Sequence, residues 1–148
     1  MSGVPTLSGQ GSGWEHFPHG ADIGVRGWGH DVAAAFEQAA LATTAIVADP
    51  SLIRPETSVD ITCEAASLED LLVEWLNALI FEMSTRQMVF GSFAVTTDEL
   101  RLTASARGEL VDPDRHDAGV EPKGATYTML RVTQREDGTW EAQCVVDV

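Results

Sequence analysis

The residues of this chain that are best suited to chemistry lie near its two ends. Near the start, His19-Gly-Ala-Asp22 sets an imidazole and a carboxylate just ahead of a strand-like stretch, and near the end Asp147 is flanked by Val146 and Val148. Aspartate is depleted in strands, so its place in this apolar run is unusual. Carboxylate and main-chain oxygens are the ligands that Ca²⁺ prefers, and Ca²⁺ accepts irregular sites more readily than Mg²⁺ does. Asp147 is therefore either a frayed terminal residue that points into water or, with the C-terminal group and an aspartate from elsewhere, a ligand of a divalent cation.

More familiar catalytic patterns do not occur in the sequence. It has no Gly-rich phosphate loop followed by Lys-Ser/Thr, no dinucleotide-binding fingerprint and no Cys-x-x-Cys pair for a thiolate zinc site. No Ser or Cys is marked as an activated nucleophile. A metal-dependent hydrolase that uses His19, Asp22 and Asp147 is one hypothesis, but no general base with an orienting partner is evident beside these residues. His19 itself is more typical of a turn or core histidine than of a ligand.

The charge balance indicates which classes of binding partner are expected. Among 148 residues, 9 Lys and Arg stand against 23 Asp and Glu, which gives a formal net charge of −14. Proteins hold nucleic-acid backbones through Lys and Arg that displace condensed counterions, so extensive direct contact with RNA or DNA is not expected. The acidity fits three interpretations: solubility through self-repulsion, a cation site, or a basic protein partner. The acidic segment 111–123 is most simply a solvated loop.

The N-terminal segment predicts no targeting signal. Met1 to Gly13 is rich in Gly and Ser and has neither a basic start nor an apolar run, so we expect a flexible leader. No run of about 18 apolar residues occurs, and no transmembrane helix is expected. Cys63 and Cys144 alternate with apolar neighbours, which is typical of reduced core residues. Together these features predict a cytoplasmic protein.

Two segments predict helices. In residues 31–47 apolar side chains recur at helical spacing before an Asp-Pro stop. Ser67-Leu-Glu-Asp70 is a capping-box signature, and it opens a stronger helix that extends over residues 68–86. This second helix has a broad apolar stripe and further apolar residues outside it, Phe81 among them. A helix that is apolar over most of its circumference is covered on more than one side.

The remaining segments alternate as strands do. Hairpin turns are expected at Thr97-Asp98 and at Asp137-Gly138. Strands are expected at residues 23–28, 57–65, 88–96, 99–107, 125–134 and 139–147. Because the later strands come as hairpins without intervening helices, the pattern predicts an α+β fold with antiparallel sheets. Two nearly buried helices among so many strands indicate helices held between sheets, in a single domain.

The chain resembles the archease family at four motifs in the same order. The matching segments are His19 to Gly29, which resembles the family's His-Thr-Ala-Asp-Ile-Gly opening, the helix Ser67 to Leu79, the block from Gly108 through His116 to Tyr127, and the ending Trp140 to Val148. The resemblance covers residues 14–148 and therefore predicts one archease-like domain after a leader of residues 1–13.

The resemblance implies a fold, a metal site and a role. The fold is a three-layer β-α-β sandwich in which two largely buried helices lie between antiparallel β-sheets. The metal site is usually described for calcium, and the matching positions are Asp22, Asp147 and Val148, the last through its main-chain oxygen or terminal carboxylate. The role is that of a non-enzymatic cofactor of an RtcB-type RNA ligase in tRNA splicing and RNA repair, which promotes guanylylation and multiple turnover of the ligase. A chaperone-like modulator of a tRNA methyltransferase is the alternative.

Three positions depart from the family pattern. Gly20 replaces the usual Thr and removes a hydroxyl near the implied metal site. Thr128 stands where the family often has His, so a role for that His cannot be carried over. Gly124 stands where a bulkier residue is common, which is expected to loosen the start of a strand.

Overall fold

The computed structural model describes residues 11–148, so most of the expected leader lies outside the described residues. In chain order the elements are β1 (Gly13–His19), β2 (Asp22–Gly29), α1 (Val32–Val47), the short 3-10 helix η1 (Pro50–Leu52), β3 (Thr57–Glu64), α2 (Leu68–Arg86), β4 (Met88–Asp98), β5 (Arg101–Leu110), α3 (Pro113–His116), β6 (Gly124–Ala125), β7 (Arg131–Gln134) and β8 (Trp140–Asp147).

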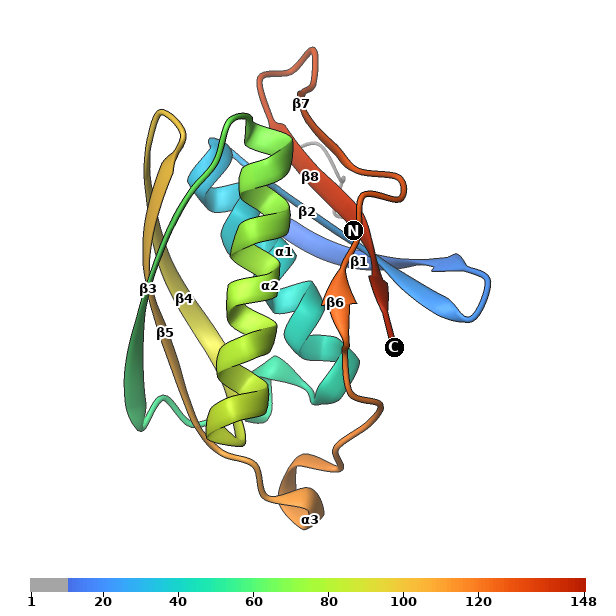
Figure 1. Ribbon diagram of the computed structural model, residues 1–148, viewed down its shortest axis with the longest axis vertical. Coiled ribbons are helices and arrows are strands. Elements are labelled where there is room, and N and C mark those ends of the chain that lie inside the picture. Colours follow the sequence, from blue (N-terminus) through green and yellow to red (C-terminus); the bar gives the residue numbers. More distant parts are fainter. Residues whose placement is uncertain (1–10) are drawn as a thin grey trace.

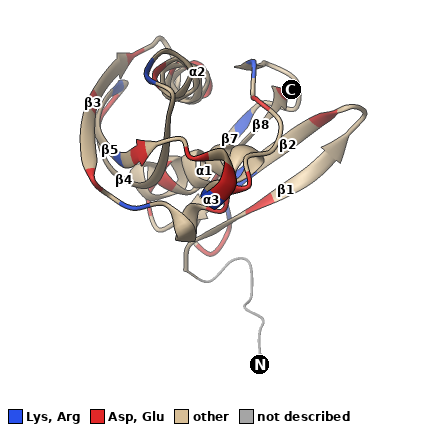
Figure 2. Cartoon of the chain, turned by 90° about the horizontal axis from the view of Figure 1, so that it is seen from below, with Lys and Arg blue, Asp and Glu red and all other residues tan. Residues whose placement is uncertain are grey.

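Two antiparallel sheets enclose the longer helices (Figure 1). The larger sheet has the strand order β1-β2-β8-β6, with β7 also paired to β8, and the smaller sheet has the order β3-β5-β4. Seen from below, α1 and α2 lie between the β3-β5-β4 sheet on one side and the β1-β2-β8 sheet on the other (Figure 2). The prediction of an α+β sandwich with two helices between antiparallel sheets is confirmed.

Helix α1 packs closely on the larger sheet. The carboxylate of Asp31 caps the helix by accepting from the N–H of Ala34 at 2.8 Å. On the strand beneath, a Cβ added to Gly27 would lie only 2.3 Å from the backbone nitrogen of Ala39. Helix and strand backbones therefore approach each other more closely than any side chain at position 27 would permit, which accounts for glycine in the strand and for the alanine-rich face of the helix.

Helix α2 begins and ends where the sequence predicts. The hydroxyl of Ser67 accepts from the N–H of Asp70 at 3.1 Å, and Gln87 ends the helix in the left-handed conformation at φ 55°. On the inner face, the indole N–H of Trp75 donates to the carbonyl of Phe36 at 3.0 Å. This buried hydrogen bond joins α2 to α1 at the centre of the sandwich.

The outer face of α2 is less covered than its composition predicts. Phe81 leaves 61% of its surface exposed, and Glu74 and Asn77 on the preceding turns are also exposed. The helix is covered on more than one side, as expected, but neither sheet extends over its front in Figure 1, and Phe81 remains exposed.

The sequence did not predict β1. Proline lacks the N–H that a central strand needs, so Pro18 does not favour a strand in this segment. Among residues 11–148, strand β1 pairs only with β2, from Gly13↔Trp28 to His19↔Asp22. It is an edge strand, where proline is tolerated.

Two further strand predictions are wrong in detail. The β4–β5 turn falls at residues 99–100 and not at Thr97-Asp98, because Asp98 still pairs with Arg101 and Glu99 takes the left-handed conformation. The single strand expected over 125–134 is divided into β6 and β7. Met129 between them has φ 55°, a conformation that a continuous strand cannot contain.

The outer edge of β4 is covered by side chains of α1. The hydroxyl of Thr44 donates to the carbonyl of Phe90, and the carboxylate of Glu37 accepts from the N–H of Val95, each at 2.8 Å. An uncovered strand edge is a template for pairing with another chain. These two bonds satisfy edge groups of the smaller sheet within the fold.

Both cysteines are buried and unpaired, as predicted, and they belong to different sheets. Cys63 lies in β3 and Cys144 in β8. Burial raises the pKa of the Cys144 thiol to about 12 and also raises the pKa of Cys63. Within residues 11–148, no helix combines the length and the apolar character needed to cross a membrane.

The contact between α1 and β2 generates a stability prediction. Gly27→Ala is expected to lower the free energy of unfolding by about 1–3 kcal/mol, because overpacking at a rigid backbone contact forces the helix away from the sheet. Gly124→Ala is the control, since its added Cβ meets only Asn77 Oδ1 at 3.4 Å. Urea denaturation of both variants checks the difference, and equal losses would contradict the close packing of α1.

Candidate functional site

The register of the larger sheet brings Asp22 and Asp147 together. Strands β2 and β8 pair in antiparallel fashion up to Ile23↔Val146. The next step of that register sets Asp22 opposite Asp147. Directly opposed residues of an antiparallel pair project from the same face of the sheet, so the two carboxylates are neighbours although they are far apart in the sequence.

The neighbouring strands extend this pair into a row. His19 pairs with Asp22 across the β1–β2 turn, and Gly124 of β6 pairs with Asp147 on its other side. Four neighbouring strands therefore contribute one terminal residue each to the same end of the sheet. We call these residues the terminal row: His19, Asp22, Asp147 and Gly124.

Two backbone hydrogen bonds fix the end of the chain in the terminal row. The N–H of Val148 donates to Oδ1 of Asp22 at 3.3 Å, and the N–H of Lys123 donates to the carbonyl of Asp147 at 2.8 Å. The backbone of Asp147 is thus held between β2 and β6 and is not frayed. Its side chain is exposed, whereas Asp22 and Val148 are half-buried.

The oxygen donors of this region suit a hard cation. The carboxylates of Asp22 and Asp147 and the main-chain oxygens of Val148 are of the type that Ca²⁺ and Mg²⁺ bind. Within residues 11–148, no group of three or more His, Cys, Asp and Glu side chains is arranged to hold a metal ion, so a third protein donor has to be a main-chain oxygen or a side chain of another type. Ca²⁺ takes about six to eight oxygens. The residues therefore fit a cation held in part by this chain, with positions left for water or for a partner.

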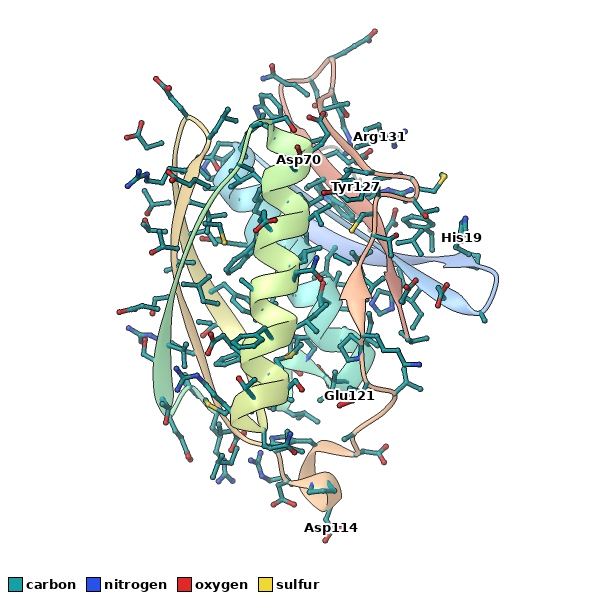
Figure 3. All side chains as sticks on the ribbon, in the orientation of Figure 1. His19, Asp70, Asp114, Glu121, Tyr127 and Arg131 are labelled. Atoms are coloured by element: carbon teal, nitrogen blue, oxygen red, sulfur yellow. The ribbon has the colours of Figure 1, made fainter. Side chains whose placement is uncertain are left out.

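His19 lies at the exposed end of the β1–β2 hairpin (Figure 3). Gly20 forms the turn with φ 61°, a conformation that favours glycine, so its departure from the usual Thr fits the backbone here. Because the described residues contain no three-residue metal group, His19 does not join Asp22 and Asp147 in one. This arrangement gives the hydrolase hypothesis no support.

Buried polar side chains hold β8 in place on the outer face of the larger sheet. Oε1 of Gln143 accepts from Arg26 at 2.9 Å and from Arg131 at 3.0 Å, and its Nε2 donates to the carbonyl of Met129 at 3.0 Å. Arg131 also donates to Glu141 at 2.8 Å. Gln143 is only 1% exposed, and a buried polar group with all its partners present favours one register over its neighbours.

A second polar cluster, which the sequence did not predict, joins α3 to β5. The ring of His116 is fully buried, with Nδ1 accepting from the N–H of Asp112 and Nε2 lying 2.9 Å from Oε2 of Glu109. Because Nδ1 accepts, the ring proton is assigned to Nε2, where it is donated to Glu109. The same carboxylate accepts from the guanidinium of Arg115 and from the N–H of Arg54.

The segment 111–123 was expected to be a solvated loop, so the burial of His116 within it was not predicted. The one signal that the sequence offered is Asp112-Pro113, an N-cap followed by proline at the first helical position. Its partners lie on β5 and on the segment before β3, so the burial of His116 depends on tertiary structure. The cluster fixes the start of the acidic segment 111–123 to the body of the protein.

Known proteins resemble this chain along nearly its whole length. Residues 14–148 match the model of the Archease protein family (MTH1598/TM1083). A protein archease from Pyrococcus furiosus is 36% identical over 139 residues, which cover 91% of this chain and 98% of that protein. A protein archease from Methanosarcina barkeri is 35% identical over 147 residues, which cover 96% of this chain and 100% of that protein. The solution structure of Methanobacterium thermoautotrophicum protein 1598 superposes with a TM-score of 0.81 at 31% identity, covering 92% of this chain and 99% of that one.

The polar cluster predicts a pH dependence of stability. Hydrogen bonds from the Arg115 guanidinium, the backbone N–H of Arg54 and the ring of His116 lower the pKa of Glu109 from 4.5 to about 2. A carboxyl whose pKa is lower in the folded state stabilises the protein above its unfolded pKa, and this contribution is lost as the pH falls through the folded value. The free energy of unfolding of the wild type should therefore decline between about pH 4.5 and pH 2 more than that of Glu109→Gln.

Urea denaturation over a pH series measures this difference. The control is Glu64→Gln, which removes an exposed ion pair with Arg101 whose glutamate side chain is 67% accessible. Exposed pairs contribute little, so this variant should follow the wild type. Parallel curves for the wild type and Glu109→Gln would contradict the assignment.

Proposed function

We propose that this chain, which belongs to the archease family, is a metal-binding accessory protein that activates an RtcB-type RNA ligase and is not itself an enzyme. Its proposed effect is to promote guanylylation and multiple turnover of the ligase in tRNA splicing and RNA repair. The observation that carries the proposal is the pairing of β2 with β8, which sets Asp22 opposite Asp147 while Val148 donates to Asp22.

The exposure of the terminal row suits an accessory role. Asp147 is exposed, and the C-terminus lies at the surface beside the β1–β2 hairpin (Figure 1). A cation held there by few protein oxygens keeps positions open, and groups of a bound ligase are one source of the missing donors. The proposed Ca²⁺ would supply positive charge at the contact with the ligase, and Asp22, Asp147 and Val148 would hold it.

The net charge also supports a basic protein partner. An RNA ligase needs a basic channel for its substrate, and this chain carries a formal charge of −14. Opposite potentials steer two proteins into encounter and raise the association rate, most strongly at low salt. The same acidity disfavours extensive contact of this chain with the RNA itself.

The metal assignment predicts the effect of neutralising one carboxylate. Asp22→Asn keeps the oxygen that accepts from Val148 but removes the charge, so the fold should persist while Ca²⁺ affinity falls about tenfold or more. Isothermal titration calorimetry with CaCl₂ measures the affinity. The thermal midpoint gives a second readout, because saturating ligand stabilises the folded state by about 2.7 kcal/mol at 100 times Kd.

Asp60→Asn is the matched control for this test. Asp60 is exposed on β3 of the other sheet, so its variant loses one carboxylate far from the terminal row. Wild-type affinity in Asp22→Asn, or an equal loss in Asp60→Asn, would refute Ca²⁺ binding at the terminal row.

The proposed role predicts that a variant can keep its fold and yet fail to stimulate the ligase. Asp147→Asn should remain folded and bind Ca²⁺ weakly, and it should fail to raise the yield of the covalent ligase–GMP adduct or the number of ligation turnovers. The measurement uses the ligase of the same organism, GTP and a cleaved RNA with and without this protein. Asp60→Asn again serves as the control and should stimulate like the wild type.

Two results would count against the role. Full stimulation by Asp147→Asn would separate the terminal row from ligase activation. Recovery of a tRNA methyltransferase instead of the ligase, by mass spectrometry of native complexes, would favour the alternative chaperone-like function.

A further inference from the structure

An apolar pocket of about 200 Å³ opens between the C-terminal half of α2 and the acidic segment 111–123. Ile80 and Met83 line it from the helix, and Val111 and Val120 line it from the segment. Among its lining residues only Glu121 is charged. Apolar cavities of roughly 150 Å³ accept a molecule the size of benzene, so this pocket has room for one large apolar side chain.

The wall of this pocket is held in place at both ends. The N–H of Gly119 donates to the carbonyl of Val47 at the end of α1, at 2.7 Å. A Cβ on Gly119 would lie 2.9 Å from the carbonyl oxygen of Ile46, so the segment rests directly on the helix backbone. At the other end, the N–H of Lys123 donates to the carbonyl of Asp147 at 2.8 Å. The pocket is therefore a built feature of the fold.

The pocket and the terminal row share one segment of chain. Glu121 and Pro122 line the pocket, and Gly124, two residues later, pairs with Asp147. Ala125 follows and is tied to α2, because its N–H donates to Asn77 Oδ1 at 2.8 Å. The pocket and the terminal row are therefore close together along this segment, since only Lys123 separates Pro122 from Gly124.

The surroundings of the pocket combine exposed apolar surface with negative charge. Val120 is 52% exposed, and Phe81 is 61% exposed and neighbours the pocket residue Ser84 at helical spacing i, i+3. Asp117 and Glu121 flank the apolar run between them. Figure 3 places Glu121 beside the lower part of α2. Figure 2 shows acidic residues at α3, in the same acidic segment. The nearby Arg115 is engaged by Glu109, so it does not offset this charge.

We propose that this pocket docks an apolar side chain carried on a basic segment of the partner, next to the terminal row. The assignment of that partner as the ligase rests on the proposed function. An apolar anchor fills the cavity, and flanking Lys or Arg side chains face Asp117 and Glu121. A second copy of this chain is a poor occupant, because each copy carries a net charge of −14 and brings the same acidic rim.

The test fills the pocket without altering charge. Ser84→Trp adds an indole at an exposed position that lines the pocket, and Thr85→Trp adds the same group one position along, at an exposed position outside the lining. The probe is a fluorescein-labelled amphipathic Lys/Leu peptide, and its Glu/Leu analogue tests the charge requirement. Fluorescence anisotropy should give saturable binding of the Lys/Leu peptide that Ser84→Trp weakens about tenfold and Thr85→Trp leaves unchanged.

Equal binding by both tryptophan variants, or equal affinity for the Glu/Leu peptide, would overturn the proposal. So would a wild-type dimer in sedimentation that Ser84→Trp converts to monomer, because a second copy would then be the occupant. Circular dichroism should confirm that both variants remain folded.

A parallel measurement with the ligase distinguishes failure of the docking pocket from failure of the proposed function. If the wild type stimulates the ligase and Ser84→Trp does so equally, the pocket is not the docking site but the proposed function stands. If the wild type neither binds nor stimulates the ligase yet prefers the Lys/Leu peptide through the pocket, the docking chemistry stands and the proposed function fails.

Discussion

The antiparallel register between β2 and β8 is the constraint on which the rest of the structure depends. Strand β8 is central, with β2 along one edge and β6 and β7 along the other. Because side chains alternate between faces, a shift of one residue would turn Asp147 toward the helices and Val146 toward water. It would also turn Gln143 into the apolar layer, away from its partners Arg26 and Arg131. The register that buries the core side of β8 therefore also holds Asp147 against Asp22.

The helices and most of the strands could be predicted because their signals are local. The caps at Asp31 and Ser67 and the apolar periodicity behind them need no tertiary information, and both helices begin as expected. Predictions failed where context decides the outcome. The segment around Pro18 becomes a strand because it lies at a sheet edge, and a positive φ at Met129 interrupts what the sequence reads as a continuous strand.

The candidate site was only partly visible in the sequence. Asp147 is conspicuous because it interrupts an apolar run, but only the family resemblance implied Asp22 as its fellow ligand, since spacing alone does not indicate which distant strand will pair with the last one. The buried cluster of Glu109 and His116 was missed because His116 belongs to an acidic segment that looks solvated. Only the folded chain brings it against Glu109 of β5 and supplies the Arg115 and backbone donors that compensate the burial of the carboxylate.

The two thiols lie on opposite sides of the sandwich, and this makes them reporters of how it comes apart. Cys63 belongs to the three-stranded sheet and Cys144 to the five-stranded one, and neither thiol is accessible enough or acidic enough to react readily while its own sheet is closed. The rate at which an alkylating reagent modifies each cysteine therefore measures how often its own sheet opens. Equal rates would mean that the layers separate in a single cooperative event, and unequal rates would identify the layer that detaches first.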